Sequence, residues 1–116
     1  MTHEESNIQR WCVFWFRRQY PRLARVLFAV PNGGARSRVT AAILKAEGVV
    51  AGVADLLLLV PSGQYHGLCI EMKTRRGRQQ PTQKEWQREV EAQGYKYTVC
   101  RSVDEFRETV SAYLRG

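Results

Sequence analysis

The segment GLCIEMKTRRGR, residues 67–78, combines an apolar, strand-like run with Glu71 and Lys73 and then opens into three arginines. Residues two apart in a strand project to the same face, so this carboxylate and ammonium are aimed at one place. The preceding apolar segment, residues 53–60, is joined to it by PSGQYHG, whose Pro and Gly mark a turn. The two segments predict a β-hairpin that returns Glu71 close to Asp55.

Patterns outside the hairpin predict an α/β fold. Glycine and proline signals, capping boxes at Thr82 with Glu85 and at Ser102 with Glu105, and apolar periodicity divide the rest of the chain. Helices are expected over residues 3–20, 36–47 and 82–93 and after Ser102, and further strands over residues 26–30 and 95–100. The order α, β, α, β, β, α, β, α allows the last strand to lie parallel to that of Glu71. We expect a mixed central sheet flanked by helices on both faces, with residues 53–60 central and covered on both sides.

The first expected helix is apolar around much of its circumference. One apolar stripe contains Ile8, Trp11, Cys12 and Trp15, and a second contains Val13, Phe16 and Tyr20. Such a helix must be covered on more than one side. Two interpretations stay open, a buried core helix and a subunit interface.

Composition indicates one ordinary globular domain over residues 1–116. The chain is 44% hydrophobic and 25% charged. Its longest apolar run is interrupted by Asp55 and is too short to span a bilayer, and the N-terminus has no signal-peptide pattern. We therefore expect no membrane association and a cytoplasmic location. The three cysteines, an odd number lying far apart, are expected to be reduced and buried.

The net charge of +7 favours a polyanionic partner, and nucleic acid is the commonest one. Five arginines lie in two expected loops, namely Arg75, Arg76 and Arg78 in one and Arg36 and Arg38 in the other. They are candidates for contacts with DNA phosphates. The alternative is that they are solvated loop charges.

Asp55 and Glu71 together suggest a cation site. Two carboxylates side by side repel each other and favour a cation between them, and oxygen ligands alone favour Mg²⁺ or Mn²⁺ over zinc. Lys73, on the same side, would orient an attacking water or hold a phosphate oxygen. Such a site would hydrolyse a phosphodiester. The plainer alternative is a strand-end cap at Asp55 and a surface pair of Glu71 with Lys73.

Several segments, in order and spacing, carry a family resemblance: EESNIQ, PNGGAR, LKAEGVVAGVADLLLLVP, YHGLCIEMKT followed by GR, and QKEW. Over nearly its whole length the chain resembles the VRR-NUC family, the virus-type replication-repair nuclease domains of the PD-(D/E)xK superfamily. The resemblance implies a restriction-endonuclease-like core. One departure is Ala54, because the family usually has proline before the aspartate.

The resemblance also implies roles for individual residues. Asp55 and Glu71 correspond to the metal-binding carboxylates, Lys73 to the catalytic lysine, and the backbone carbonyl of Met72 to a further metal ligand. Gln83 corresponds to the family glutamine in the helix after the ExK strand. Glu5 corresponds to the acidic residue of the first helix that completes the site, in part through water.

Helical spacing agrees with the last two assignments. Glu5 shares a helical face with Ile8, Gln9 and Cys12, which turns this carboxylate toward the core. Gln83 shares its face with Trp86 and Val90, which points it inward over the sheet. From spacing alone, Glu5 would equally be an acid that favours the helix dipole, and Gln83 a structural hydrogen-bonding residue.

Stand-alone members of the family, from phages and bacteria, resemble Holliday junction resolvases and act as homodimers. The resemblance thus implies a Mg²⁺- or Mn²⁺-dependent, structure-selective DNA endonuclease acting on branched DNA in replication or repair, in a bacterial cell or in the host of a phage. Two alternatives stay open. One is a non-catalytic DNA-binding module, and the other is a restriction-type, sequence-specific nuclease, for which 116 residues leave little room.

Overall fold

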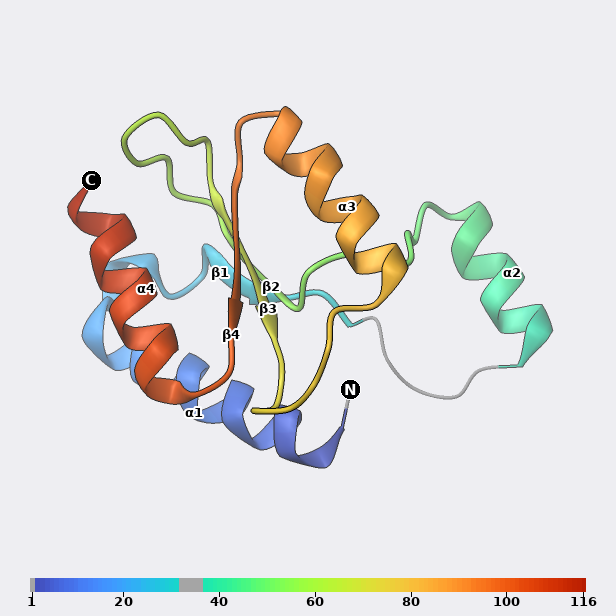
Figure 1. Cartoon of the computed structure of the whole chain (residues 1–116), viewed down its shortest axis with the longest axis horizontal. Helices are drawn as coiled ribbons and strands as arrows, with labels where there is room; N and C mark the ends of the chain where they lie inside the picture. Colours follow the sequence, from blue (N-terminus) through green and yellow to red (C-terminus); the bar gives the residue numbers. More distant parts are fainter. Residues whose placement is uncertain (1, 32–36) are drawn as a thin grey trace.

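The computed structural model describes residues 2–31 and 37–116 (Figure 1). Along the chain the elements are α1 (His3–Gln19), the 3₁₀ turn η1 (Pro21–Leu23), β1 (Leu27–Ala29), α2 (Arg38–Ala46), β2 (Leu56–Leu58), β3 (Leu68–Met72), α3 (Pro81–Ala92), β4 (Lys96–Cys100) and α4 (Val103–Arg115). This is the predicted order with shorter strands and one added turn. That turn begins at Pro21, where proline cannot continue α1.

The four strands form one mixed sheet in the order β1-β2-β3-β4. β2 pairs antiparallel with both β1 and β3, and β4 pairs parallel with β3. Leu56 lies opposite Ile70 across the β2–β3 pair, which confirms the predicted hairpin. The parallel β3–β4 pair, connected through α3, confirms the predicted helical crossover.

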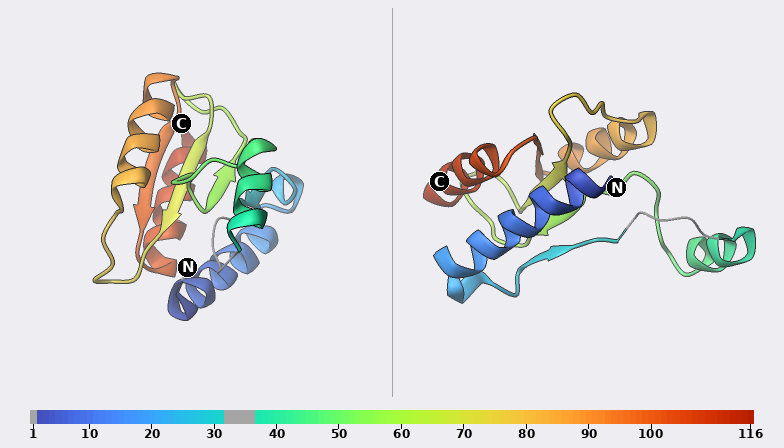
Figure 2. Two further views of the ribbon diagram at one scale, coloured as in Figure 1. Left: turned by 90° about the vertical axis from the view of Figure 1, so that its right-hand side faces the viewer. Right: turned by 90° about the horizontal axis from the view of Figure 1, so that it is seen from below.

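Helices cover both faces of this sheet, as predicted. α1 and α4 pack together on one face, and α3 lies on the other (Figures 1 and 2). Side chains of β3 alternate between the two layers, so Ile70 belongs to the core beneath α1 and α4 whereas Cys69 packs with Trp86 and Val90 of α3. Glu71, two residues after Cys69, therefore projects to the α3 face.

β2 is an inner strand, but the expectation that both of its faces are covered is wrong in part. Leu56 and Leu58 are fully buried on the α1–α4 face. On the other face Leu57 is only half-buried, and Leu59, just beyond the strand, is 53% exposed. The reason is that α3 covers the β3–β4 half of the sheet, while the next helix available, α2, stands away from it (Figure 1).

α2 has no buried residue. Its side chains Val39 and Ile43 are 70% and 51% exposed, and Val49 and Val50 just after it are exposed as well. The helix begins at Ser37, whose hydroxyl accepts a hydrogen bond from the Thr40 amide at 3.1 Å. The N-cap therefore stabilises α2, and packing against the sheet does not.

α1 is largely a core helix. Cys12 and Phe16 are fully buried, and Ile8, Val13, Trp15 and Tyr20 pack around them. Trp11 of the same apolar stripe is 64% exposed and pairs edge-to-face with Phe14, which is 52% exposed, so the interpretation as a subunit interface stays open for this part of the helix. These two aromatic side chains form the bare outer surface of α1.

The cysteine prediction is confirmed. Cys12, Cys69 and Cys100 are free and buried. Burial raises the pKa of the Cys12 thiol to about 12 and that of Cys69 to about 11, so both stay protonated at neutral pH. Among the helices described, none combines the length and the apolar character that a membrane span requires.

The cap of α4 is as predicted, but that of α3 is not. The Ser102 hydroxyl accepts a hydrogen bond from the Glu105 amide at 3.1 Å. α3 starts at Pro81 instead of after Thr82, and its N-cap is Gln80. The Gln83 side-chain oxygen accepts a hydrogen bond from the Gln80 amide at 2.7 Å, so glutamines take the place of the expected Thr82 and Glu85.

Candidate functional site

The hairpin brings Asp55 to the end of β3 that carries the acidic and basic pair. Asp55 immediately precedes β2, and continuing the β2–β3 register by one residue places it opposite Glu71. Its Oδ2 accepts a hydrogen bond from the Met72 backbone amide at 2.7 Å, and its carbonyl accepts one from the Val30 amide at 2.9 Å. These bonds fix the carboxylate between β1 and β3.

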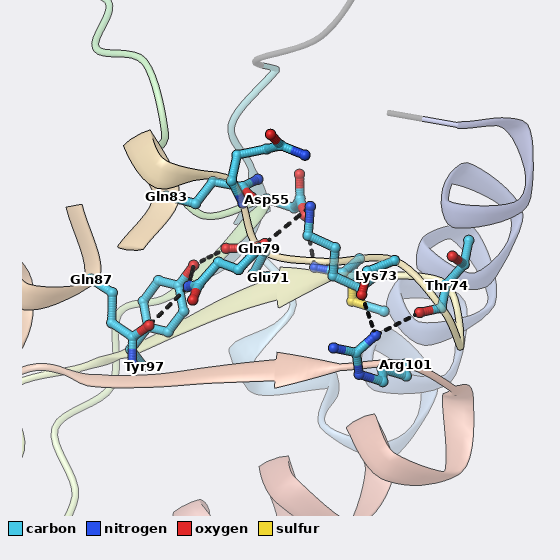
Figure 3. A network of polar contacts seen from close by, with 12 residues as sticks. Asp55, Glu71, Lys73, Thr74, Gln79, Gln83, Gln87, Tyr97 and Arg101 are labelled. Carbon is cyan, nitrogen blue, oxygen red and sulfur yellow. Dashed lines mark hydrogen bonds and ion pairs between the residues drawn. The ribbon is translucent and has the colours of Figure 1, made fainter. Parts of the chain in front are cut away.

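Glu71 and Lys73 are buried together on the α3 face (Figure 3). Glu71 is fully buried, and Lys73 is 7% exposed. The Lys73 Nζ lies 3.3 Å from Glu71 Oε2, and Glu71 Oε1 accepts a hydrogen bond from the Tyr97 hydroxyl. The alternative of an exposed Glu71–Lys73 surface pair is therefore wrong.

Burial disfavours the charge on both carboxylates. It raises the pKa of Asp55 above the usual 3.8, an effect that the Met72 hydrogen bond opposes and the nearby Glu5 charge increases. Burial likewise raises the pKa of Glu71; Lys73 opposes this rise and Asp55 adds to it. A bound cation would relieve both the half-buried Asp55 and the buried Glu71, whose charges repel each other.

A cleft of about 660 Å³ opens beside these residues. Its walls include Glu5, Gln9, Asp55, Lys73 and Gln83, while Glu71 lies buried beneath. Four of the five predicted catalytic residues thus line one cleft, and the fifth contacts one of them. The chain brings them together from α1, the β2–β3 hairpin and α3.

Glu5 and Gln83 line the cleft from two different helices, α1 and α3. Glu5 is half-buried near the start of α1, where its amide donates to the Thr2 hydroxyl at 3.1 Å, and its charge acts on Asp55. Gln83 is half-buried at the start of α3, and Trp86 and Val90 on the same face pack against the sheet. Gln83 also lines the cleft, and its Oε1 accepts the capping hydrogen bond of the Gln80 amide.

The donor chemistry fits a hard divalent cation. Glu71 Oε2 is buried, pairs with the Lys73 ammonium at 3.3 Å and meets no further partner within the described chain, so a cation beside Lys73 could share this oxygen. No cluster of three or more His, Cys, Asp or Glu side chains that could hold a metal occurs in residues 2–31 and 37–116. Mg²⁺ usually keeps several waters and needs only one or two carboxylates, and Asp55 and Glu71 supply these. The Met72 carbonyl stays predicted as a further ligand, and Glu5, which forms no three-acid cluster with Asp55 and Glu71, stays predicted as a ligand through water.

The loop after β3 presents arginines to solvent. Arg75, Arg76 and Arg78 are exposed, and the loop backbone is held by Arg101 at the end of β4. The Arg101 Nη1 donates to the carbonyls of Thr74 at 2.8 Å and Gly77 at 2.6 Å (Figure 3). Arg38 is exposed on α2, apart from this loop, and Arg36 lies outside the described residues.

Sequence reasoning missed Tyr97, Gln79 and Arg101. Tyr97 contacts Glu71, Gln79 contacts Tyr97, and Arg101 holds the basic loop. The one available signal was the predicted parallel pairing, because a strand beside that of Glu71 must send alternate side chains to the same face. Which of its residues reach Glu71 depends on a register that the pattern did not give.

Comparison with known proteins identifies a nuclease domain family. The family model of the VRR-NUC domain matches residues 1–104. A solved structure described as a VRR_NUC domain protein is 28% identical in sequence, with a TM-score of 0.85 over 99% of this chain and 91% of that chain. No curated protein matches the sequence.

Proposed function

Because the chain belongs to the VRR-NUC domain family, a nuclease family, we propose that it is a Mg²⁺- or Mn²⁺-dependent endonuclease that cleaves branched DNA. The observation that carries this proposal is the meeting of Asp55, Glu71 and Lys73 at one end of the β2–β3 hairpin, beside an open cleft. Phosphodiester hydrolysis needs an attacking water and relief of the charge that grows on the phosphate.

Residues of this chain would provide the metal ligands and the group that orients the attacking water. Asp55 and Glu71 would hold the cation, with the Met72 carbonyl and a water on Glu5 completing the set. When bound, Mg²⁺ or Mn²⁺ supplies Lewis acidity, which lowers the pKa of water and offsets phosphate charge. The Lys73 ammonium, held by Glu71 at 3.3 Å and lining the cleft, would orient the attacking water or hold a phosphate oxygen. Gln83, which also lines the cleft, would position the water or the phosphate.

The arginine loop supports DNA as the substrate. Arg75, Arg76 and Arg78 are exposed next to the cleft residue Lys73, and the net charge of the chain is +7. We propose that they contact phosphates that flank the scissile bond, with Arg38 contributing from α2; Arg36, outside the described residues, stays a further candidate. This contribution would weaken as salt concentration rises.

Branched DNA is the favoured substrate class because we propose a homodimer. Two identical sites related by a two-fold axis would cut a symmetric junction. Exposed apolar side chains on α1, Trp11 and Phe14, and on α2, Val39 and Ile43, support a second copy of the chain as the partner that covers them.

A cleavage panel tests this function. Purified protein is incubated with four-way, flapped, duplex and single-stranded DNA in Mg²⁺, in Mn²⁺ and in chelator. We expect metal-dependent cleavage of the branched substrates. Lys73→Ala should abolish cleavage and leave DNA binding nearly intact, whereas Lys96→Ala, over the Tyr65 ring and away from the cleft, should retain activity. Binding without cleavage of any substrate would favour the non-catalytic module, and cleavage of duplex at one sequence would favour the restriction-type enzyme.

A further inference from the structure

The two carboxylate oxygens of Glu71 have different surroundings. Oε1 accepts the hydrogen bond of the Tyr97 hydroxyl, whereas Oε2 forms an ion pair with Lys73 Nζ at 3.3 Å (Figure 3). Because Glu71 is fully buried, solvent does not compete for either oxygen. Tyr97 therefore holds Oε1, whereas Oε2 is paired only with Lys73, a residue that lines the cleft where a cation would bind.

The Tyr97 hydroxyl is itself oriented by neighbours. Gln79 Nε2 lies 3.2 Å from the Tyr97 oxygen and 2.8 Å from Gln87 Oε1, and Gln87 Nε2 donates to Glu91 Oε2 at 3.3 Å. Because the Gln79 amide donates to the tyrosine oxygen, the single hydroxyl proton is directed to Glu71. A chain of hydrogen bonds thus runs from the exposed side of α3 to the buried carboxylate.

Packing fixes the Tyr97 ring independently of its hydroxyl. The ring is 8% exposed, belongs to the small core under α3 with Ala54 and Cys69, and has its centroid 6.1 Å from that of Trp86. Phenylalanine would fill the same space. The hydroxyl can therefore be removed without creating a cavity.

We propose that Tyr97 is a positioning residue that occupies Glu71 Oε1 and so makes Glu71 a one-oxygen ligand through Oε2, which favours Mg²⁺ over Ca²⁺. Ca²⁺ accepts bidentate carboxylates and six to eight oxygens, whereas Mg²⁺ requires a compact octahedron. A carboxylate with one oxygen held by tyrosine presents the geometry that suits the smaller ion. The inference rests on the proposed function, since it takes Asp55 and Glu71 to hold a divalent cation.

Tyr97→Phe tests the proposal on the protein without DNA. Mn²⁺ binding is measured by titration calorimetry, and Mg²⁺ and Ca²⁺ affinities are obtained by competition against Mn²⁺. Loss of a hydrogen bond to a metal ligand typically weakens metal binding by roughly 10- to 100-fold. We expect such a loss for Mg²⁺ and a smaller loss or a gain for Ca²⁺, so that the ratio of Ca²⁺ to Mg²⁺ affinity rises about tenfold or more.

Tyr113→Phe is the matched control. Tyr113 is also buried, and its hydroxyl donates to the Val60 carbonyl at 2.6 Å on the other side of the sheet. The Tyr113→Phe substitution should leave the ratio of Ca²⁺ to Mg²⁺ affinity unchanged, even if it lowers the melting temperature. Gln79→Met, which removes the donor to the Tyr97 oxygen, should shift the ratio in the same direction as Tyr97→Phe but by less.

The outcomes separate this inference from the proposed function. The proposed role of Tyr97 is overturned if the wild type binds metal but Tyr97→Phe leaves the ratio of Ca²⁺ to Mg²⁺ affinity unchanged. An equal loss of affinity for both ions overturns it as well. Either result leaves the proposed metal site intact. A wild type that binds none of the three ions removes the metal site and the inference with it. A ratio that shifts equally in Tyr113→Phe also overturns the proposal, because the effect would then not be specific to Glu71.

Discussion

Asp55 lowers the stability of the metal-free protein at neutral pH, because its folded-state pKa is raised by burial. A raised carboxyl pKa means that the folded state binds the proton more tightly than the unfolded state. Its contribution to stability is present below the ordinary pKa of 3.8 and is lost as pH rises through the folded pKa. The same sign holds for Glu71. The acids that would bind the cation are thus kept at the expense of stability.

We predict that Asp55→Asn raises the melting temperature of the metal-free protein by a few degrees at pH 7. Asparagine removes the buried charge and keeps an oxygen that can accept the Met72 hydrogen bond. The gain should shrink as pH falls toward 4, where wild-type Asp55 becomes protonated. Thermal unfolding in chelator, scanned from pH 4 to 8, measures both effects.

With added Mn²⁺, the wild type should have a higher melting temperature than Asp55→Asn. Ligand at 100 times its Kd stabilises a folded protein by about 2.7 kcal/mol, and Asp55→Asn should lose most of this gain. Asp104→Asn serves as the control, because the Asp104 side chain is 88% exposed and lies in the first turn of α4. It should lower stability slightly through the helix dipole. Unchanged Mn²⁺ affinity in Asp55→Asn would mean that Asp55 is not a ligand.

At the scale of elements, Gly52 sets how closely the loop before β2 approaches α3. Gly52 has a φ of +87°, and a Cβ there would lie 2.4 Å from the Thr82 carbonyl oxygen and 3.0 Å from the Gln83 amide nitrogen. This loop leads to Asp55, and the first turn of α3 carries Gln83. The distance between the loop before Asp55 and the first turn of α3 therefore depends on the absence of a Cβ atom at Gly52.

Gly52→Ala should be more destabilising than Gly48→Ala, and urea denaturation measures the difference. Gly48 also has a positive φ, +106°, but a Cβ there meets nothing within 4 Å. Gly48→Ala should cost about 1–2 kcal/mol from left-handed backbone strain alone. Gly52→Ala should add roughly 1–3 kcal/mol from the clash and should also weaken Mn²⁺ binding. Equal losses in the two variants would contradict a close-packed contact between the loop and α3.

Sequence patterns predicted some of the elements and their contacts but not others. The hairpin and the crossover were predictable, because turn residues and apolar runs set them locally. The cap of α3 was not, because its glutamines lie outside the usual N-cap preferences. The contact of Tyr97 with Glu71 depends on the β3–β4 register, which tertiary packing fixes. Trp11 follows the apolar period of α1 and is nevertheless exposed, since periodicity does not report what is available to cover a face.

At the scale of the whole molecule, α2 is the element least explained by a single chain. It has nine residues, none of them buried, and isolated helices shorter than about 12–15 residues are marginal in water. Most helical stability in proteins comes from packing of an apolar face. Val39, Ala42, Ile43 and Ala46 form such a face at helical spacing. A second copy of the chain that covers this face, together with Trp11 and Phe14 of α1, would explain both bare surfaces.

We therefore predict a dimer, measured by sedimentation equilibrium as twice the 13.4 kDa of one chain at micromolar concentration. Ile43→Glu should raise the dimer dissociation constant at least tenfold, because it places a charge in the apolar face of α2. Ala41→Glu is the control, since Ala41 lies about 200° around the helix from Val39. Trp11→Glu tests the α1 surface in the same way. A wild-type monomer would remove the two-fold argument for symmetric junctions and leave the nuclease site untouched, since every residue assigned to it comes from one chain.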